Sequence, residues 1–283
     1  MKAKHLRSMT SKCPNWIVLL EEQRPPLRFM AKGHELDCSH IPFAMPERKC
    51  VLHQNWLNLT FMHWKVDLEM LQPHIPEGLE IDLFEGEAYI GVIPFEMNNV
   101  RPRGLPWVPF VSTFGEFNIR AYVVKDGVPG VLFLTLDAQS RVTCFHAPRS
   151  YGLPYRYAKA VVEVRDDHHF VWSSKRQKGG QALVGSAVST SPHTRKKAEL
   201  GTLEYFLFER YSLYTWHNGC LHRAYTHHAP WEYCDGTAAV QENTLLDSFQ
   251  LGIADSLQPE FVHLSRGVKV QTWGVLPISE GTV

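Results

Sequence analysis

The sequence lacks an excess of charge of either sign. Its 29 lysines and arginines are matched by 29 aspartates and glutamates, which gives a formal net charge of +0 at pH 7. Proteins that bind duplex nucleic acid usually carry a basic surplus, because they neutralise phosphates. We therefore expect no nucleic-acid partner.

Long apolar runs are also missing. A helix needs about 20 consecutive apolar residues to cross a bilayer. The nearest candidate, residues 16–20, is followed at once by Glu21 and Glu22. The basic first residues are not followed by the apolar stretch of a signal peptide. We expect no membrane partner.

Motifs that mark cofactor and metal sites are absent as well. No G-x-G-x-x-G, G-x-x-x-x-G-K or G-x-S-x-G run occurs, which argues against a dinucleotide site, a phosphate-binding loop and a nucleophile elbow. The six cysteines form no C-x-x-C pair, and the histidines around Cys220 fit no zinc spacing. We expect no cofactor, no metal, free thiols and a cytoplasmic location.

What the chain does have is enough apolar material for a sizeable core, with 44% hydrophobic and 20% charged residues. Residues 1–50 show no clean periodicity and contain five prolines, so we predict an N-terminal extension there. Residues 51–283 are predicted to form one domain.

Strands dominate the predicted domain. They are predicted over residues 56–64, 79–84, 88–97, 115–125, 130–136, 155–165, 169–174 and 182–188. Apolar residues at helical spacing predict a helix over 201–214, and another is predicted over 137–151 with Asp137 near its start. Many strands with a few helices indicate the α+β class, with an antiparallel barrel or sandwich and packed helices.

Residues 115–125 alternate cleanly between two faces. Glu116, Asn118, Arg120 and Tyr122 share one face, and apolar residues share the other. Such a polar face either lines an interior, where Arg120 could hold a carboxylate, or is the solvent face of an ordinary strand. The alternation leaves both interpretations open.

Several short runs, in one order along residues 50–275, resemble the YqjF-like family of uncharacterised proteins. They are Trp56 with FMHW (61–64), IPEGLEID (75–82), GVIPF (91–95), FGEFNIRAYV (114–123), LDA (136–138), LPY (153–155), GTLE (201–204), ERY (209–211) and HHAPW (227–231). That family is similar to acetoacetate decarboxylase, which implies an antiparallel β-barrel or cone with an internal pocket.

The resemblance also tests the decarboxylase chemistry. Those enzymes form a Schiff base on a lysine with a depressed pKa, placed after a helix in a Pro-Lys-Lys run. Glu116 matches the family's glutamate, but Tyr155 and Arg156 stand where the two lysines belong. A phenol cannot form an imine, and Lys159 is the nearest substitute amine. We therefore do not carry the imine mechanism over.

The hypothesis that follows is a pocket for a small anionic ligand, such as an oxo acid. Glu116 and Tyr155 are its candidate acid–base residues, and the candidate ligand contacts are His63, Asn118, Arg120 and Arg149. Two alternatives stay open: a non-catalytic binding or sensing module, and a structural scaffold in which Arg120 faces solvent. A homo-oligomer is possible in each case.

Overall fold

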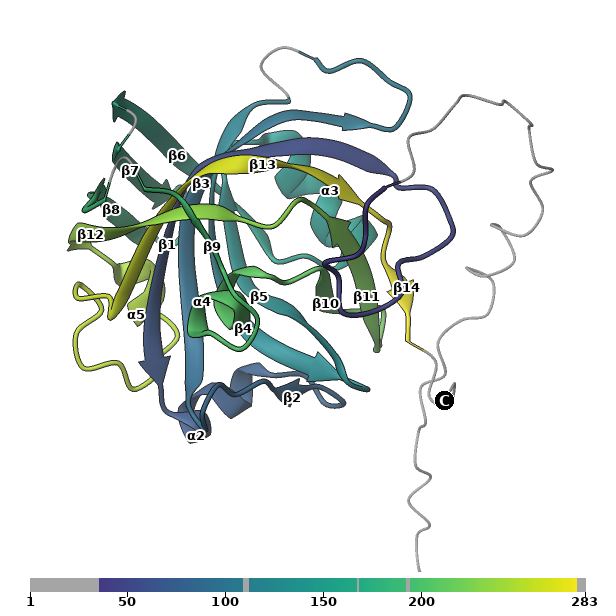
Figure 1. Cartoon of the computed structure of the whole chain (residues 1–283). Helices are drawn as coiled ribbons and strands as arrows, with labels where there is room; N and C mark the ends of the chain where they lie inside the picture. The colour runs from purple at the N-terminus through teal and green to yellow at the C-terminus, as the bar shows by residue number, and fades with distance from the viewer. Residues whose placement is uncertain (1–35, 109–111, 167, 192–193, 279–283) are drawn as a thin grey trace, which may run out of the picture.

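The computed structural model describes residues 36–108, 112–166, 168–191 and 194–278 (Figure 1). Its strands are β1 (Leu52–Val66), β2 (Glu80–Ile81), β3 (Ala88–Pro102), β4 (Phe114–Lys125), β5 (Val128–Ala138), β6 (Tyr155–Asp166), β7 (His169–Arg176), β8 (Ala182–Ser189), β9 (Lys196–Lys197), β10 (Ser212–His217), β11 (Cys220–His227), β12 (Glu232–Glu242), β13 (Phe261–Thr272) and β14 (Leu276–Pro277). The short helices are α2 (Leu68–Leu71), η1 (Gln72–His74), α3 (Arg141–Tyr151), α4 (Leu203–Phe208) and α5 (Thr244–Asp247). The strand-dominated part of the predicted class is confirmed.

The strands form one strongly curved sheet, as Figure 1 shows. Neighbours run in the order β5, β6, β7, β8, β12, β13, β1, β3 and β4, and β4 pairs with β5 as well. The succession of pairings thus returns to its starting strand. One face of this sheet carries Tyr122 of β4, whose hydroxyl donates to the carbonyl of Leu207 in α4.

The sequence had suggested that all strands pair antiparallel, but two pairs of the described strands are parallel. β5 runs parallel to β6 and also to β10. Two parallel strands need a crossover connection, and α3 supplies one between β5 and β6. The prediction of a purely antiparallel sheet is therefore wrong at β5.

The two faces of β4 contribute to two different hydrophobic clusters. Phe117, Ile119 and Ala121 belong to one cluster together with Trp64 and Trp172. The opposite face of β4 contributes Tyr122 to a second cluster, which also contains Phe61, Phe208 and Trp231. Both faces of β4 are buried, so the interpretation of its polar face as a solvent face is wrong.

Two predicted helices differ in extent from the observed ones. The helix predicted over 201–214 ends at Phe208, because residues 212–217 form β10 and pair with β11 and β5. Asp137 does not begin the other helix. It is fully buried on β5, and Ser140 caps α3 by accepting from the backbone N–H of Thr143.

The described part of the N-terminal region packs against the sheet. The ring of His40 hydrogen-bonds the carbonyl of His228, and Ile41 is buried. Among the cysteines, the predicted free thiols are confirmed for Cys38, Cys50, Cys144 and Cys234. The same prediction is wrong for Cys220, which is disulfide-bonded. No helix in the described ranges is long and apolar enough to cross a membrane.

Candidate functional site

Glu116 and Tyr155 meet across two strands. β4 places Glu116 opposite Ala138 of β5, and β5 places Leu136 beside Tyr155 of β6. The Tyr155 hydroxyl donates to Glu116 Oε2 over 2.8 Å. Glu116 is 2% exposed. The two residues that the sequence selected for acid–base chemistry are therefore in direct contact.

Burial dominates the protonation of this pair. It raises the pKa of Glu116 from the ordinary 4.5 to about 8, and the hydrogen bond from Tyr155 opposes this only in part. Burial, followed by the charge of Glu116, raises the pKa of Tyr155 well above its ordinary value. Glu116 is therefore mostly a neutral carboxylic acid at pH 7, able to donate a proton or a hydrogen bond.

Cys144, on α3, is a neighbour of this pair that the sequence did not single out. Its Sγ donates to the carbonyl of Ala138, which lies opposite Glu116. Burial, helped by the charge of Glu116, raises the pKa of this thiol to about 11. Cys144 is thus a neutral thiol at pH 7 and a poor nucleophile.

Arg120 lies on the same face of β4 and is 8% exposed. Its Nε donates to the Tyr122 hydroxyl over 3.2 Å, and its Nη2 donates to the carbonyl of Leu207 over 2.8 Å. Its Cζ lies 5.6 Å from the centre of the Phe61 ring. Within the described residues it forms no ion pair with a carboxylate. A buried guanidinium normally has such a partner.

Two further polar atoms of this interior face lack partners in the described residues. They are Asn118 Oδ1 and His63 Nδ1. Asn118 is 5% exposed and His63 is fully buried. Buried polar groups are nearly always hydrogen-bonded, so each unpartnered atom marks a place where a bound molecule could supply the missing contact.

Local structure explains why Arg120 fits here. Its cross-strand partner on β3 is Gly91. A Cβ at this position would lie 3.1 Å from both His63 Nε2 and the Tyr122 hydroxyl, so a side chain there would crowd these two groups. Leu207 lies in the last turn of α4, where backbone carbonyls have no helical partner. Gly91 and Leu207 were not predicted, since their roles come from packing between distant strands and α4.

Other predicted residues lie apart from this cluster. Arg149 is exposed on α3, where it donates to the carbonyl of Phe145 and stacks on its ring at 4.0 Å. Arg156 and Lys159 are exposed on β6. The structure thus brings Glu116, Tyr155, Asn118, Arg120 and His63 to one interior face, and leaves Arg149 out.

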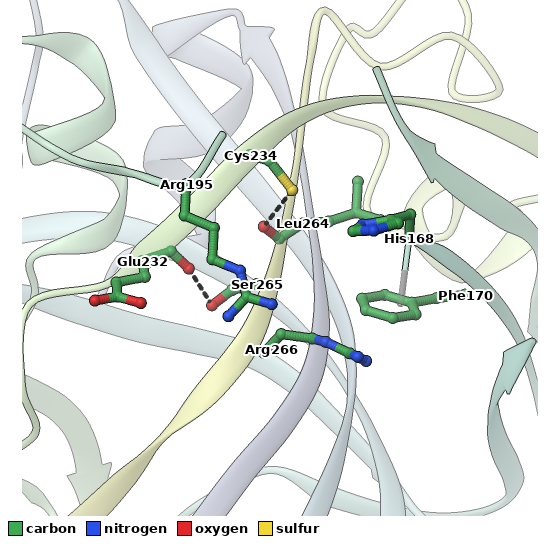
Figure 2. Close-up of a pocket in the computed structure, with 8 residues that line it drawn as sticks. All are labelled: His168, Phe170, Arg195, Glu232, Cys234, Leu264, Ser265 and Arg266. Carbon is green, nitrogen blue, oxygen red and sulfur yellow. Dashed lines mark hydrogen bonds between the residues drawn. The ribbon is translucent and has the colours of Figure 1, made fainter. Parts of the chain in front are cut away.

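Two cavities in the described part of the chain lie elsewhere. Figure 2 shows one beside β12 and β13, where Cys234 and Ser265 hydrogen-bond backbone carbonyls. Its volume of about 10 Å³ has room for roughly one water molecule. The other, of about 220 Å³, is a groove lined by residues that include Phe133, Trp216 and Phe249. None of the predicted site residues lines either cavity.

Comparison with known proteins identifies relatives of most of the chain. The model of DUF2071, described as "Uncharacterized conserved protein (COG2071)", matches residues 53–269. Uncharacterized protein YqjF of Bacillus subtilis (strain 168) is 33% identical over 232 residues, which cover 81% of this chain and 93% of that protein. The resemblance to the YqjF-like family is confirmed.

Solved structures show the same fold at low identity. Acetoacetate decarboxylase from Legionella pneumophila subsp. pneumophila str. Philadelphia 1 matches with a TM-score of 0.57 and 11% identity, covering 89% of this chain and 98% of that one. The enduracididine biosynthesis enzyme MppR complexed with pyruvate matches with a TM-score of 0.55 and 13% identity, covering 82% of this chain and 91% of that one. At such identities the likeness concerns the fold alone.

Proposed function

Because the chain belongs to the DUF2071 family and has an acetoacetate decarboxylase-like fold, we propose that it binds a small oxo acid inside a barrel- or cone-shaped sheet. The observation that carries the proposal is the buried Arg120, which has no carboxylate partner in the described residues. One structural neighbour was solved with pyruvate. A carboxylate of that kind is the group that a buried arginine requires.

The charge of Arg120 is costly to bury without a partner. An isolated ion inside a protein loses several kcal/mol of hydration, which a nearby opposite charge can offset. Within the described residues, the hydrogen bonds of Arg120 go to two neutral oxygens. A ligand carboxylate would complete this charge balance and could accept two parallel N–H bonds from the guanidinium.

The second polar group of an oxo acid is its carbonyl oxygen. Glu116 is a neutral acid at pH 7 and can donate a hydrogen bond to such an oxygen on a ligand in the interior, while Tyr155 donates to one of its carboxyl oxygens. No lysine is among the buried residues of the described ranges. The chemistry that this site offers is therefore hydrogen bonding and proton transfer rather than imine formation.

Two alternatives lead to different results. The scaffold hypothesis predicts an exposed Arg120, and the side chain is buried. The hypothesis of a non-catalytic binding module is separated from an enzyme by Glu116→Gln. If the protein is a binding module, Glu116→Gln keeps the ligand affinity, and neither the wild type nor the variant forms product. If it is an enzyme, the substitution lowers turnover while the ligand still binds.

The proposal is tested by a thermal-shift screen with pyruvate and other small oxo, hydroxy and enol acids. A ligand that binds only the folded state raises the melting temperature. We expect a shift with the wild type, none with Arg120→Gln, and an unchanged shift with Arg149→Gln, the matched control from the exposed face of α3. Equal shifts in all three proteins would place the anion elsewhere and overturn the proposal.

A further inference from the structure

His63 lies at the centre of the interior face, next to the proposed anion site. It is fully buried on β1, opposite Gly91 of β3 and Phe261 of β13. Its ring stacks on Phe61 at 6.5 Å, and the ring of Phe208 from α4 lies 6.2 Å away. Because these neighbours are apolar rings, few polar atoms are available to form hydrogen bonds with the His63 nitrogens.

The hydrogen bonds around Tyr122 determine what His63 can do. The Tyr122 hydroxyl donates its single proton to the carbonyl of Leu207 and accepts from Arg120 Nε. His63 Nε2 lies 2.8 Å from the same hydroxyl. We assign the hydroxyl proton to the Leu207 carbonyl, which makes His63 Nε2 the donor in this contact. A neutral His63 then has an unprotonated Nδ1.

That remaining nitrogen, His63 Nδ1, is buried and has no partner in the described residues. A buried polar atom without a hydrogen bond costs about 1–3 kcal/mol. His63 and Arg120 share the Tyr122 hydroxyl as a common contact. The unpartnered nitrogen therefore belongs to the same small region as the unpaired guanidinium.

The charged and titratable groups around His63 come from four elements. Arg120 and Tyr122 lie on β4, and His263 lies on β13, with Glu204 and Asp235 each 3.9 Å from its Nε2. The guanidinium of Arg210, after α4, lies 5.1 Å from the centre of the Tyr122 ring. Burial, followed by the charges of Arg120 and His263, holds the pKa of His63 well below its usual range.

An anion bound at Arg120 would change this balance. It would offset the positive charge that now disfavours a protonated imidazole, and it would offer an acceptor to a new Nδ1–H. A protonated His63 would then donate from both nitrogens, to Tyr122 and to the ligand. One binding event would then give partners to both the Arg120 guanidinium and His63 Nδ1.

We propose that His63 contacts the anion held by Arg120 through Nδ1 and takes up a proton as that anion binds. This inference rests on the proposed function, because it needs an anion at Arg120. It makes the ligand's affinity depend on pH below neutrality. The dissociation constant should fall by up to tenfold for each unit of decreasing pH, in the range between the free and ligand-bound pKa of His63.

The test is calorimetry of pyruvate binding at pH 6.0 in two buffers with different ionisation enthalpies, which counts protons taken up. At this pH Glu116 stays protonated, since its pKa is about 8. We expect up to one proton per pyruvate in the wild type and none in His63→Gln, which should bind more weakly. His74→Gln is the control, because His74 bonds a carbonyl of the loop after α5, away from Tyr122.

A second measurement keeps the inference testable if His63→Gln fails to fold. In wild-type protein labelled with ¹⁵N-histidine, His63 should be a neutral ring when free and an imidazolium with pyruvate bound. Pyruvate binding that depends on Arg120 but takes up no proton, or takes up as many in His63→Gln, would overturn the inference alone. An absence of Arg120-dependent binding would overturn the proposed function and this inference with it.

Discussion

Two buried arginines lie near the Tyr122 ring, and they differ in their partners. The guanidinium of Arg120 lies 5.4 Å from the ring centre and that of Arg210 lies 5.1 Å from it. Arg210 Nη1 forms an ion pair with Asp82 at 2.5 Å. Arg120 forms none within the described residues. The charge of Arg210 is therefore neutralised by the protein itself. The charge of Arg120 is left for a ligand to neutralise.

Two buried carboxyl groups show the same contrast. Glu209 accepts from the Tyr211 hydroxyl and from the backbone N–H of Trp231. Glu116 accepts from Tyr155 and, in the described residues, has no cation beside it. The carboxyl group of Glu209 thus has protein donors at both oxygens, whereas Glu116 has one such donor in the described residues and can form a further hydrogen bond with a ligand.

The largest expected effect is on stability as a function of pH. The folded-state pKa of Glu116 is about 8 against an ordinary 4.5. Between these values the unfolded state has lost this proton and the folded state has kept it, so stability falls as pH rises from about 4.5 to about 8. At about 1.4 kcal/mol per unit, Glu116→Gln should remove up to about 5 kcal/mol of that fall.

Urea denaturation at pH 5 and pH 8.5 measures this prediction. Glu209→Gln is the matched comparison, because its carboxyl accepts two hydrogen bonds and is organised for structure. We expect it to destabilise the protein at both pH values. Equal pH dependence in the wild type and Glu116→Gln would show that Glu116 is ionised at pH 7.

The arginine pair should separate structure from binding. Arg210→Met leaves Asp82 without its partner and should cost about 3 kcal/mol, at the lower end for a broken buried pair because Asp82 keeps 24% of its side-chain exposure. Arg120→Met removes a charge that has no counterion and should change stability by less than about 1 kcal/mol. Chemical denaturation of both variants is the measurement. A larger loss with Arg120→Met would mean that Arg120 is a structural residue.

A smaller effect is expected from Gly91→Ala. The added methyl would lie 3.0 Å from Ile93 Cδ1 and 3.1 Å from both His63 Nε2 and the Tyr122 hydroxyl. Tight interiors resist added groups at about 1–3 kcal/mol. We expect a loss in this range together with weaker pyruvate binding, measured by thermal unfolding and calorimetry. Full affinity in this variant would argue against a role for the His63–Tyr122 contact.

The smallest effect is expected from Tyr155→Phe. It removes one hydrogen bond, worth about 1 kcal/mol. That bond lowers the pKa of Glu116, so its loss should move this pKa further up. An NMR titration of the Glu116 side-chain carbon measures the change. A pKa that falls in Tyr155→Phe would contradict the assigned contact.

The sequence predicted a large part of the fold, because the period-two pattern of residues 115–125 survives in β4. It did not predict that the polar face would be interior, since alternation looks the same on a half-exposed strand. That distinction depends on α4, whose Leu207 carbonyl covers Arg120. Alternation alone favoured the solvent face, and the family resemblance brought the two interpretations close to even; the burial of Glu116 and Arg120 agrees with the interior one.

The errors arose where long-range pairing outweighs local pattern. Helical spacing continues through Tyr211, yet residues 212–217 are a strand because β5 and β11 pair with them. Asp137 resembled a helix cap, but its carboxylate is bound by Arg176 from β7. Arg149 was selected by its position beside the predicted helix exit, but its side chain turns back along α3 to the carbonyl and ring of Phe145. The pairing of β10 with β5 and the bond from Arg176 to Asp137 both join residues far apart in the sequence.

The most direct test of an anion site at Arg120 is a crystal structure of the protein grown with pyruvate. We expect density for a carboxylate within hydrogen-bond distance of the Arg120 guanidinium. Pyruvate bound only at the exposed Arg149, or an Arg120 guanidinium that pairs with a carboxylate of the protein itself, would contradict it.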